Sequence, residues 1–162
     1  MKTPSLHFAT FAPEDASTLP APQLCTVDEV MTRDVVSVRP DTSVETLAEL
    51  MLEHRISGLP VVDGAGRLVG LVSKTDLVRA QNSDGEADSA VLPRGVHEVS
   101  GATVADLMSP RVLCVRTGAQ LSEAARLMVD AGVHRLPVIS RGGALQGMVS
   151  TSDVVRWVAG LP

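Results

Sequence analysis

Aromatic residues are almost absent from this chain of 162 residues, which has two Phe, one Trp and no Tyr. Phe8 and Phe11 lie near the amino terminus, so Trp157 is the single ring in the main body. Proteins that bind single-stranded nucleic acid without sequence preference stack bases on several aromatic side chains. The shortage of rings, together with a net charge of −5, therefore argues against a nucleic-acid partner.

Long apolar runs and closely spaced metal ligands are also missing. No apolar run approaches the roughly 18 residues that a membrane-spanning helix needs, and Pro4 and Pro13 interrupt the amino-terminal segment. The chain has two cysteines, Cys25 and Cys114, without the C-x-x-C or H-x-x-x-H spacing of a zinc site. We therefore expect a cytoplasmic protein with two free thiols, no metal site and no membrane contact.

Aliphatic residues supply what a core requires. The chain is 44% apolar, with a mean hydropathy of +0.19, which is typical of a folded globular protein. Ser, His and Asp are all present, but no nucleophile elbow or related motif arranges them for catalysis. We therefore expect no enzymatic activity. Cys114 falls in an apolar run and is predicted to be a buried thiol.

A tandem repeat is the strongest feature of the sequence. When the chain is shifted by 77 positions, residues 26–79 align with residues 103–156 without a gap, and about a third of the pairs are identical. Such self-similarity predicts two copies of one structural unit. We predict repeats at 26–80 and 103–160, with a flexible tail at 1–25 and a linker at 81–102.

Each repeat has the same order of expected elements. A run rich in β-branched residues predicts a strand, and apolar residues at i, i+3, i+4 and i+7 then predict an amphipathic helix, with Thr42 and Glu45 at capping-box spacing. Two short strands joined by a glycine-containing turn and a second helix follow. In the first repeat the strands are expected at 35–38, 59–62 and 68–72 and the helices after Ser43 and Ser73, and the second repeat has its first strand at 112–115.

A single unit of about 55 residues buries only a small fraction of its surface when it stands alone. We therefore expect an α/β (α+β) fold: two pseudo-symmetric strand–helix–strand–strand–helix repeats packed sheet to sheet as one module with a shared aliphatic core.

The chemically most informative motif is Ser-x-x-Asp at the start of each second helix. It comprises Ser73, Thr75 and Asp76 in the first repeat and Ser150, Ser152 and Asp153 in the second. One interpretation is a helix cap, in which the serine hydroxyl and the carboxylate bind free backbone N–H groups. The other is a ligand site, because such a junction offers hydroxyls and a carboxylate that suits the hydroxyls of a ribose. The two roles are compatible.

A second motif, His134-Arg135, precedes the strand that contains Leu136-Pro137-Val138, and Ser57-Gly58 stands at the corresponding place in the first repeat. Adjacent His and Arg side chains can bind phosphate oxygens. The alternative is an exposed polar loop.

The order of these motifs, Val-Met-Thr, Ser-Gly-Leu-Pro-Val-Val-Asp and Gly-Leu-Val-Ser-x-x-Asp, with a second copy of the series, resembles a tandem pair of CBS domains (a Bateman module), named after cystathionine β-synthase. The resemblance covers residues 26–160. It implies one module whose two clefts bind AMP, ADP, ATP or S-adenosylmethionine as regulatory ligands, with no cofactor required. It also implies a homodimer.

The resemblance further implies two nucleotide-binding residue sets. The first is Ser73, Thr75, Asp76, Val112, Leu113, His134 and Arg135, and the second is Ser150, Ser152, Asp153, Val35, Val36, Ser57 and Gly58. The helix-start aspartate would bind ribose, and the valines and leucine would flank adenine. Only Arg55 stands near the phosphate side of the second set, and residues 27–80 have a net charge of −3 against +2 for residues 103–160. We therefore expect the Asp76 cleft to bind phosphorylated adenosine more tightly.

These observations predict a stand-alone regulatory module that signals through a change in conformation or assembly, with an unidentified effector protein as a further partner. The alternative is a dimerisation or protein-interaction module that binds no ligand.

Overall fold

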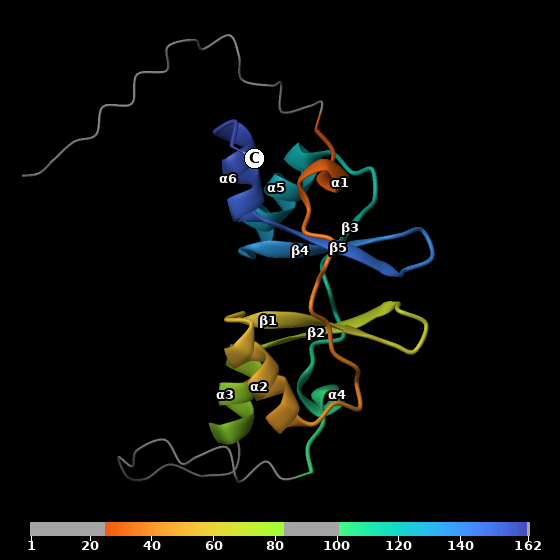
Figure 1. Ribbon diagram of the computed structural model, residues 1–162, viewed down its shortest axis with the longest axis vertical. Coiled ribbons are helices and arrows are strands. Elements are labelled where there is room, and N and C mark those ends of the chain that lie inside the picture. Colours follow the sequence, from red (N-terminus) through yellow and green to blue (C-terminus); the bar gives the residue numbers. More distant parts are fainter. Residues whose placement is uncertain (1–24, 83–100, 162) are drawn as a thin grey trace, which may run out of the picture.

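The computed structural model describes residues 25–82 and 101–161 (Figure 1). In the first repeat it has helices and strands α1 (Val27–Val30), α2 (Val44–Glu53), β1 (Gly58–Val62), β2 (Leu68–Ser73) and α3 (Lys74–Asn82). In the second it has α4 (Val104–Leu107), β3 (Val115–Arg116), α5 (Leu121–Ala131), β4 (Arg135–Ile139), β5 (Leu145–Ser150) and α6 (Thr151–Val158). Residues 1–24 of the expected tail and 83–100 of the expected linker lie outside the described residues.

Two small sheets face each other across the middle of the molecule, and the helices lie outside them at both ends (Figure 1). β1 pairs with β2 in antiparallel fashion, and β4 pairs with β5 in the same register, 77 residues later. The hairpins also meet near their turns, where Arg67 bridges Ala144. The expected α/β fold of two repeats packed sheet to sheet is confirmed.

The predicted first strand of each repeat is largely wrong. Of residues 35–38, only Val38 pairs with a neighbour, Val61, and of residues 112–115 only Val115 belongs to a strand, β3. These segments are extended but cross from one half of the molecule to the other, so few of their residues lie beside a sheet edge.

The start of α2 also differs from the prediction. Ser43 is the N-cap residue and accepts a hydrogen bond from the Thr46 N–H at 3.2 Å, whereas the Thr42 hydroxyl accepts one from the Arg39 N–H at 3.1 Å. The predicted capping box between Thr42 and Glu45 is therefore not formed.

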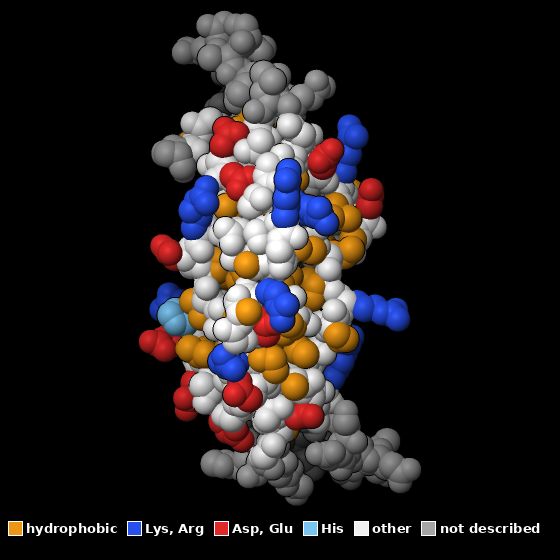
Figure 2. All heavy atoms as spheres, turned by 90° about the vertical axis from the view of Figure 1, so that its right-hand side faces the viewer, with side chains coloured by type: hydrophobic (Ala, Val, Ile, Leu, Met, Phe, Trp, Pro, Cys, Tyr) orange, Lys and Arg blue, Asp and Glu red, His pale blue; other side chains and the backbone are white. Residues whose placement is uncertain are grey.

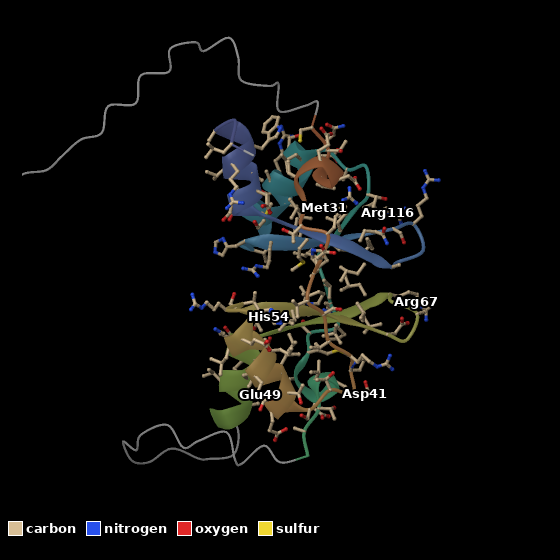
Figure 3. The ribbon with its side chains drawn as sticks, in the orientation of Figure 1. Met31, Asp41, Glu49, His54, Arg67 and Arg116 are labelled. Atoms are coloured by element: carbon tan, nitrogen blue, oxygen red, sulfur yellow. The ribbon has the colours of Figure 1, made fainter. Side chains whose placement is uncertain are left out.

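The expectation of one shared core is wrong, because the hydrophobic core is divided into two clusters, each with residues from both repeats. Cys25, Val27 and Met31, from the first repeat, are buried with α5, β4 and β5 of the second. Conversely, Val104 is buried with α2, β1 and β2 of the first repeat. Each repeat thus donates its amino-terminal segment to the core of the other half, as Figure 3 shows for Met31 in the upper half.

Backbone hydrogen bonds hold both exchanged segments in place. Val27 donates to the Ala119 carbonyl at 2.9 Å, and Leu121 donates to the Cys25 carbonyl at 2.8 Å. The other half has the matching pair: Val104 donates to the Thr42 carbonyl at 2.9 Å and Val44 to the Ala102 carbonyl at 3.2 Å.

Two glycines allow the exchanged segments to lie against the hairpins. A β-carbon placed on Gly70 would lie 2.6 Å from the sulfur of Met108. One placed on Gly147 would lie 2.6 Å from the sulfur of Met31 and 2.8 Å from the Thr32 carbonyl oxygen. Both distances are shorter than real side chains show, so alanine at either position would displace a neighbour: a flexible methionine at Gly70, and the Thr32 main chain as well at Gly147.

Both cysteines are free, as expected, but the predicted burial of Cys114 is wrong. Cys25 is the buried thiol, with 4% of its surface exposed, whereas Cys114 is only half-buried. Burial in the core raises the pKa of the Cys25 thiol, and the charge of Glu29 adds to the effect. Cys114 belongs to a crossing segment and not to a core strand, which explains its partial exposure.

Candidate functional site

The Ser-x-x-Asp motifs form two nearly identical helix caps. Asp153 accepts hydrogen bonds from the Ser150 N–H at 2.7 Å and the Ser150 hydroxyl at 2.6 Å. Asp76 accepts the same two bonds from Ser73, at 2.8 and 2.6 Å. The helix-cap interpretation is therefore confirmed at both ends, and it occupies one oxygen of each carboxylate.

The second carboxylate oxygen differs between the two motifs. Asp76 Oδ1 lies 4.0 Å from the Arg79 guanidinium in an i,i+3 pair. Asp153 Oδ1 has no partner within the described part of the chain. This oxygen is therefore available to a ligand hydroxyl in the second motif.

A cleft of about 270 Å³ lies at the Asp153 side, between the two repeats. Its polar lining combines the cap with residues from both repeats: Thr32, Asp34, Arg135, Ser150 and Asp153. Its remaining lining is Val35, Val36, Ile56, Gly58, Pro60 and Met148. The volume is slightly below the range of about 300–1,000 Å³ for small-molecule sites, which typically have apolar walls and a few convergent polar groups.

The structure brings together most of the second predicted residue set. Val35, Val36, Gly58, Ser150 and Asp153 all line the cleft. Ser57 and Ser152 are both exposed and do not line it.

Among the residues that line the cleft, Arg135 alone was predicted to belong to the other cleft, the one at Asp76. It is the first residue of β4, directly opposite Ser150 of β5, and its side chain lines the cleft that holds Asp153. It supplies the cation that the second predicted set lacked.

The other members of the first predicted set lie around the start of α3 and the second crossing segment. Asp76 is half-buried and Thr75 is exposed. Val112 is half-buried, while Leu113 has 46% of its surface exposed. His134 is exposed and its carbonyl accepts a hydrogen bond from the Thr151 N–H at 3.0 Å.

Sequence reasoning missed five lining residues: Thr32, Asp34, Ile56, Pro60 and Met148. Thr32 and Met148 exchange two backbone hydrogen bonds, each of 2.9 Å, which bring the crossing segment to the wall of the cleft. Gly147, next to Met148, was the available signal, because a glycine repeated at one strand position indicates a close approach of another segment.

The amino-terminal helices of the repeats begin with caps of the same kind. A hydrogen bond from the Thr26 N–H, and to a smaller extent one from the Thr26 hydroxyl, lowers the pKa of Glu29. The same two hydrogen bonds from Thr103 lower the pKa of Asp106. Four of the helices thus start with a hydroxyl residue and an acid three positions later. The Ser-x-x-Asp pair alone is therefore no proof of a ligand site, and the lined cleft is the distinguishing observation at Asp153.

Metal-binding clusters and membrane-spanning helices are both absent from residues 25–82 and 101–161. No group of three or more His, Cys, Asp or Glu side chains is arranged to hold a metal ion there. No helix in these ranges has the length and apolar character needed to cross a membrane.

Comparisons with known proteins agree with the geometry. The chain is 34% identical over 157 residues to the CBS domain-containing protein CBSX1, chloroplastic, of Arabidopsis thaliana, which covers 86% of this chain and 66% of CBSX1. It superposes on the crystal structure of CBSX2 in complex with AMP with a TM-score of 0.68 and 34% identity, over 83% of this chain and 96% of that one. It also superposes on the cytosolic domain of the Mg²⁺ channel MgtE in complex with ATP, with a TM-score of 0.63 and 33% identity, over 80% of this chain and 47% of that one.

The family model for the CBS domain matches the chain twice, at residues 27–83 and 104–160. These matches include both crossing segments, both hairpins and both capped helices. The chain therefore belongs to the CBS domain family.

Proposed function

We propose that this protein is a regulatory module that binds an adenosine-containing ligand in the cleft between its repeats. The cleft carries this proposal, because an apolar wall, a carboxylate with a free oxygen and a guanidinium converge on one space. AMP in the CBSX2 complex and ATP in the MgtE complex are the ligands named for two similar structures.

Each part of the ligand has a matching group. Val35, Val36 and Met148 provide aliphatic surfaces for adenine, which suits a chain with one ring in its main body. Asp153 would accept hydrogen bonds from ribose hydroxyls, and Arg135 would pair with a phosphate. At the Asp76 side, Ser73, Thr75, Val112, Leu113 and His134 are proposed to form the second site.

Regulation follows if the ligand binds one arrangement of the repeats better than another. We propose that repeats 26–80 and 103–160 act as one such module, since each core is completed by the other repeat. The two CBS repeats account for the matched parts of the chain, and we propose a non-catalytic role in the cytoplasm with an effector protein as partner. The named relative CBSX1 is chloroplastic, so the compartment stays a prediction.

A homodimer is the proposed assembly. The two long helices of each repeat expose large apolar side chains at matching positions 77 apart: Leu52, Val78, Val129 and Val155, exposed by 72, 54, 78 and 65%. Val158 of α6 is exposed as well, by 48%. A second copy of this chain suits them, because a two-fold dimer requires a face that matches itself.

A thermal-shift titration with AMP, ADP, ATP and S-adenosylmethionine tests the function. A ligand at 100 times its Kd should stabilise the fold by about 2.7 kcal/mol. The matched variant is Asp153→Asn, which keeps the shape of the side chain and removes its charge. With the best ligand, its thermal shift should be smaller than that of the unaltered protein. Absence of a shift with all four ligands would favour the module that only dimerises or docks on a protein.

A further inference from the structure

The cleft at Asp153 has more negative than positive charge. Asp34 and Asp153 contribute two carboxylates to its lining, and Arg135 contributes the single guanidinium. Asp34 and Arg135 are both exposed side chains, and neither forms an ion pair with the residues that the structure describes. A ligand with one phosphate can pair with Arg135, but each further phosphate adds negative charge beside an unpaired carboxylate.

The Asp76 side has the opposite charge at the position equivalent to Asp34. The residue 77 positions after Asp34 is Arg111. The backbone around both is the same: Ser109 exchanges two hydrogen bonds with Leu71, at 2.8 and 3.0 Å, just as the segment before Asp34 does with β5. The backbone therefore places Arg111 beside the Asp76 motif at the position that Asp34 has beside the Asp153 motif.

The strand position beside each cap shows the reverse exchange. Arg135 stands opposite Ser150, whereas its counterpart Gly58 stands opposite Ser73. In the Asp153 cleft the cation, Arg135, comes from strand β4, and the crossing segment contributes the acid Asp34. On the Asp76 side the crossing segment has the cation Arg111 at the position equivalent to Asp34.

We propose that Asp34 is a specificity-determining residue, which makes the Asp153 cleft prefer an adenosine ligand with at most one phosphate over a triphosphate. This inference rests on the proposed function, because it names the class of ligand for the same cleft. Arg111 gives the Asp76 side the opposite preference. The two sides of one module therefore select adenosine ligands of different charge.

Calorimetric titration of AMP and ATP into the full chain, in magnesium-free buffer at low salt, tests this assignment. Asp34→Asn removes the exposed carboxylate. At the Asp153 cleft it should lower the ratio of the Kd for ATP to the Kd for AMP by roughly three- to five-fold, the size expected for one solvent-exposed charge interaction. Asp34→Arg should lower it further. The effect should shrink at 0.5 M salt, because exposed charges are then screened.

Asp130→Asn is the control, since Asp130 is an exposed acid on α5 that does not line the cleft and its replacement changes the net charge equally. Its ratio should match that of the unaltered protein. The inference is overturned if AMP binds but neither Asp34 variant changes the ratio, or if Asp130→Asn lowers it as much. If the unaltered protein binds neither AMP nor ATP, this inference fails, and the proposed function fails with it only if ADP and S-adenosylmethionine also do not bind.

Discussion

The two halves of the molecule have the same hairpin and helix-cap geometry but differ in the charged residues near the caps. The helix caps at Asp76 and Asp153 have hydrogen bonds that agree within 0.1 Å, and the hairpins have the same register. Near the clefts, by contrast, Asp34 is matched by Arg111 and Gly58 by Arg135. The repeat therefore preserves the scaffold, while the side chains beside the two caps differ in charge.

The largest expected difference between the halves concerns the two glycines against which the crossing segments lie. Gly147→Ala should destabilise the fold by about 2–3 kcal/mol, because the new methyl group meets the Thr32 carbonyl as well as the flexible end of Met31. Gly70→Ala should cost about 1 kcal/mol, since its closest contact is the movable end of Met108. Urea denaturation of both variants measures the difference.

Equal losses of stability in Gly147→Ala and Gly70→Ala would show that the main-chain contact at Thr32 relaxes as easily as a methionine side chain. A second readout separates the halves further. Thr32 lines the cleft, so Gly147→Ala should also weaken AMP binding at the Asp153 side, whereas Gly70→Ala should leave that side unchanged.

The exchange of amino-terminal segments predicts a crossed pattern of local destabilisation. Val27 and Val104 are both fully buried, each in the core of the other repeat. Truncation of either to Ala should cost about 1.5 kcal/mol, from the loss of two buried methyl groups. Hydrogen exchange should accelerate in α5 and α6 for Val27→Ala, and in α2 and α3 for Val104→Ala.

Acceleration confined to the mutated residue's own repeat would contradict the exchanged arrangement. The two variants are controls for each other, because residue type, burial and repeat position are the same.

The two aspartates should be equal for stability and unequal for binding. Each anchors the same cap, so Asp76→Ala and Asp153→Ala should each cost about 1 kcal/mol. In the Asp153 cleft the lost carboxylate is also the proposed ribose ligand, so Asp153→Ala should lower AMP affinity more than ATP affinity. Asp76→Ala should lower ATP affinity more, as the earlier charge argument for the Asp76 side also predicts.

Thermal melts and calorimetry on both variants check this. Unequal losses of stability would mean that the Arg79 pair adds to the cap at Asp76. Loss of the same ligand in both variants would contradict the division of the clefts by ligand charge.

Much of this architecture was predictable from the sequence, because the repeat supplies two copies of every pattern. The helix face of Val44, Leu47 and Met51 is buried as its spacing predicts, and the strands of the first hairpin end within one residue of the expected ranges 59–62 and 68–72. The exchange of Val27 and Val104 was not predictable, since the apolar character of a segment does not say which core receives it.

The cleft was predictable in part for a related reason. Val35, Gly58 and Asp153 could be assigned from the resemblance, but Arg135 was assigned to the other cleft. A residue close to the pseudo-two-fold axis can turn toward either side, and sequence alone does not define that direction. Asp34 was missed because an exposed acid in an extended segment has no local pattern.

The smallest expected effect comes from Arg55, where the halves differ in backbone strain. Arg55 has φ +52° after α2, and its counterpart Gly132 has φ +65° after α5. A side chain in this region costs free energy that glycine does not. Arg55→Gly should therefore raise the free energy of unfolding by about 0.5–1 kcal/mol, and Gly132→Ala should lower it by a similar amount. Equilibrium unfolding of the two variants measures both changes.

Arg55 is exposed and adjoins Ile56 of the cleft, so a loss of ATP affinity in Arg55→Gly, with stability gained, would identify the strained arginine as a phosphate contact. Destabilisation by Arg55→Gly would instead mean that contacts of the arginine side chain outweigh the strain at this turn.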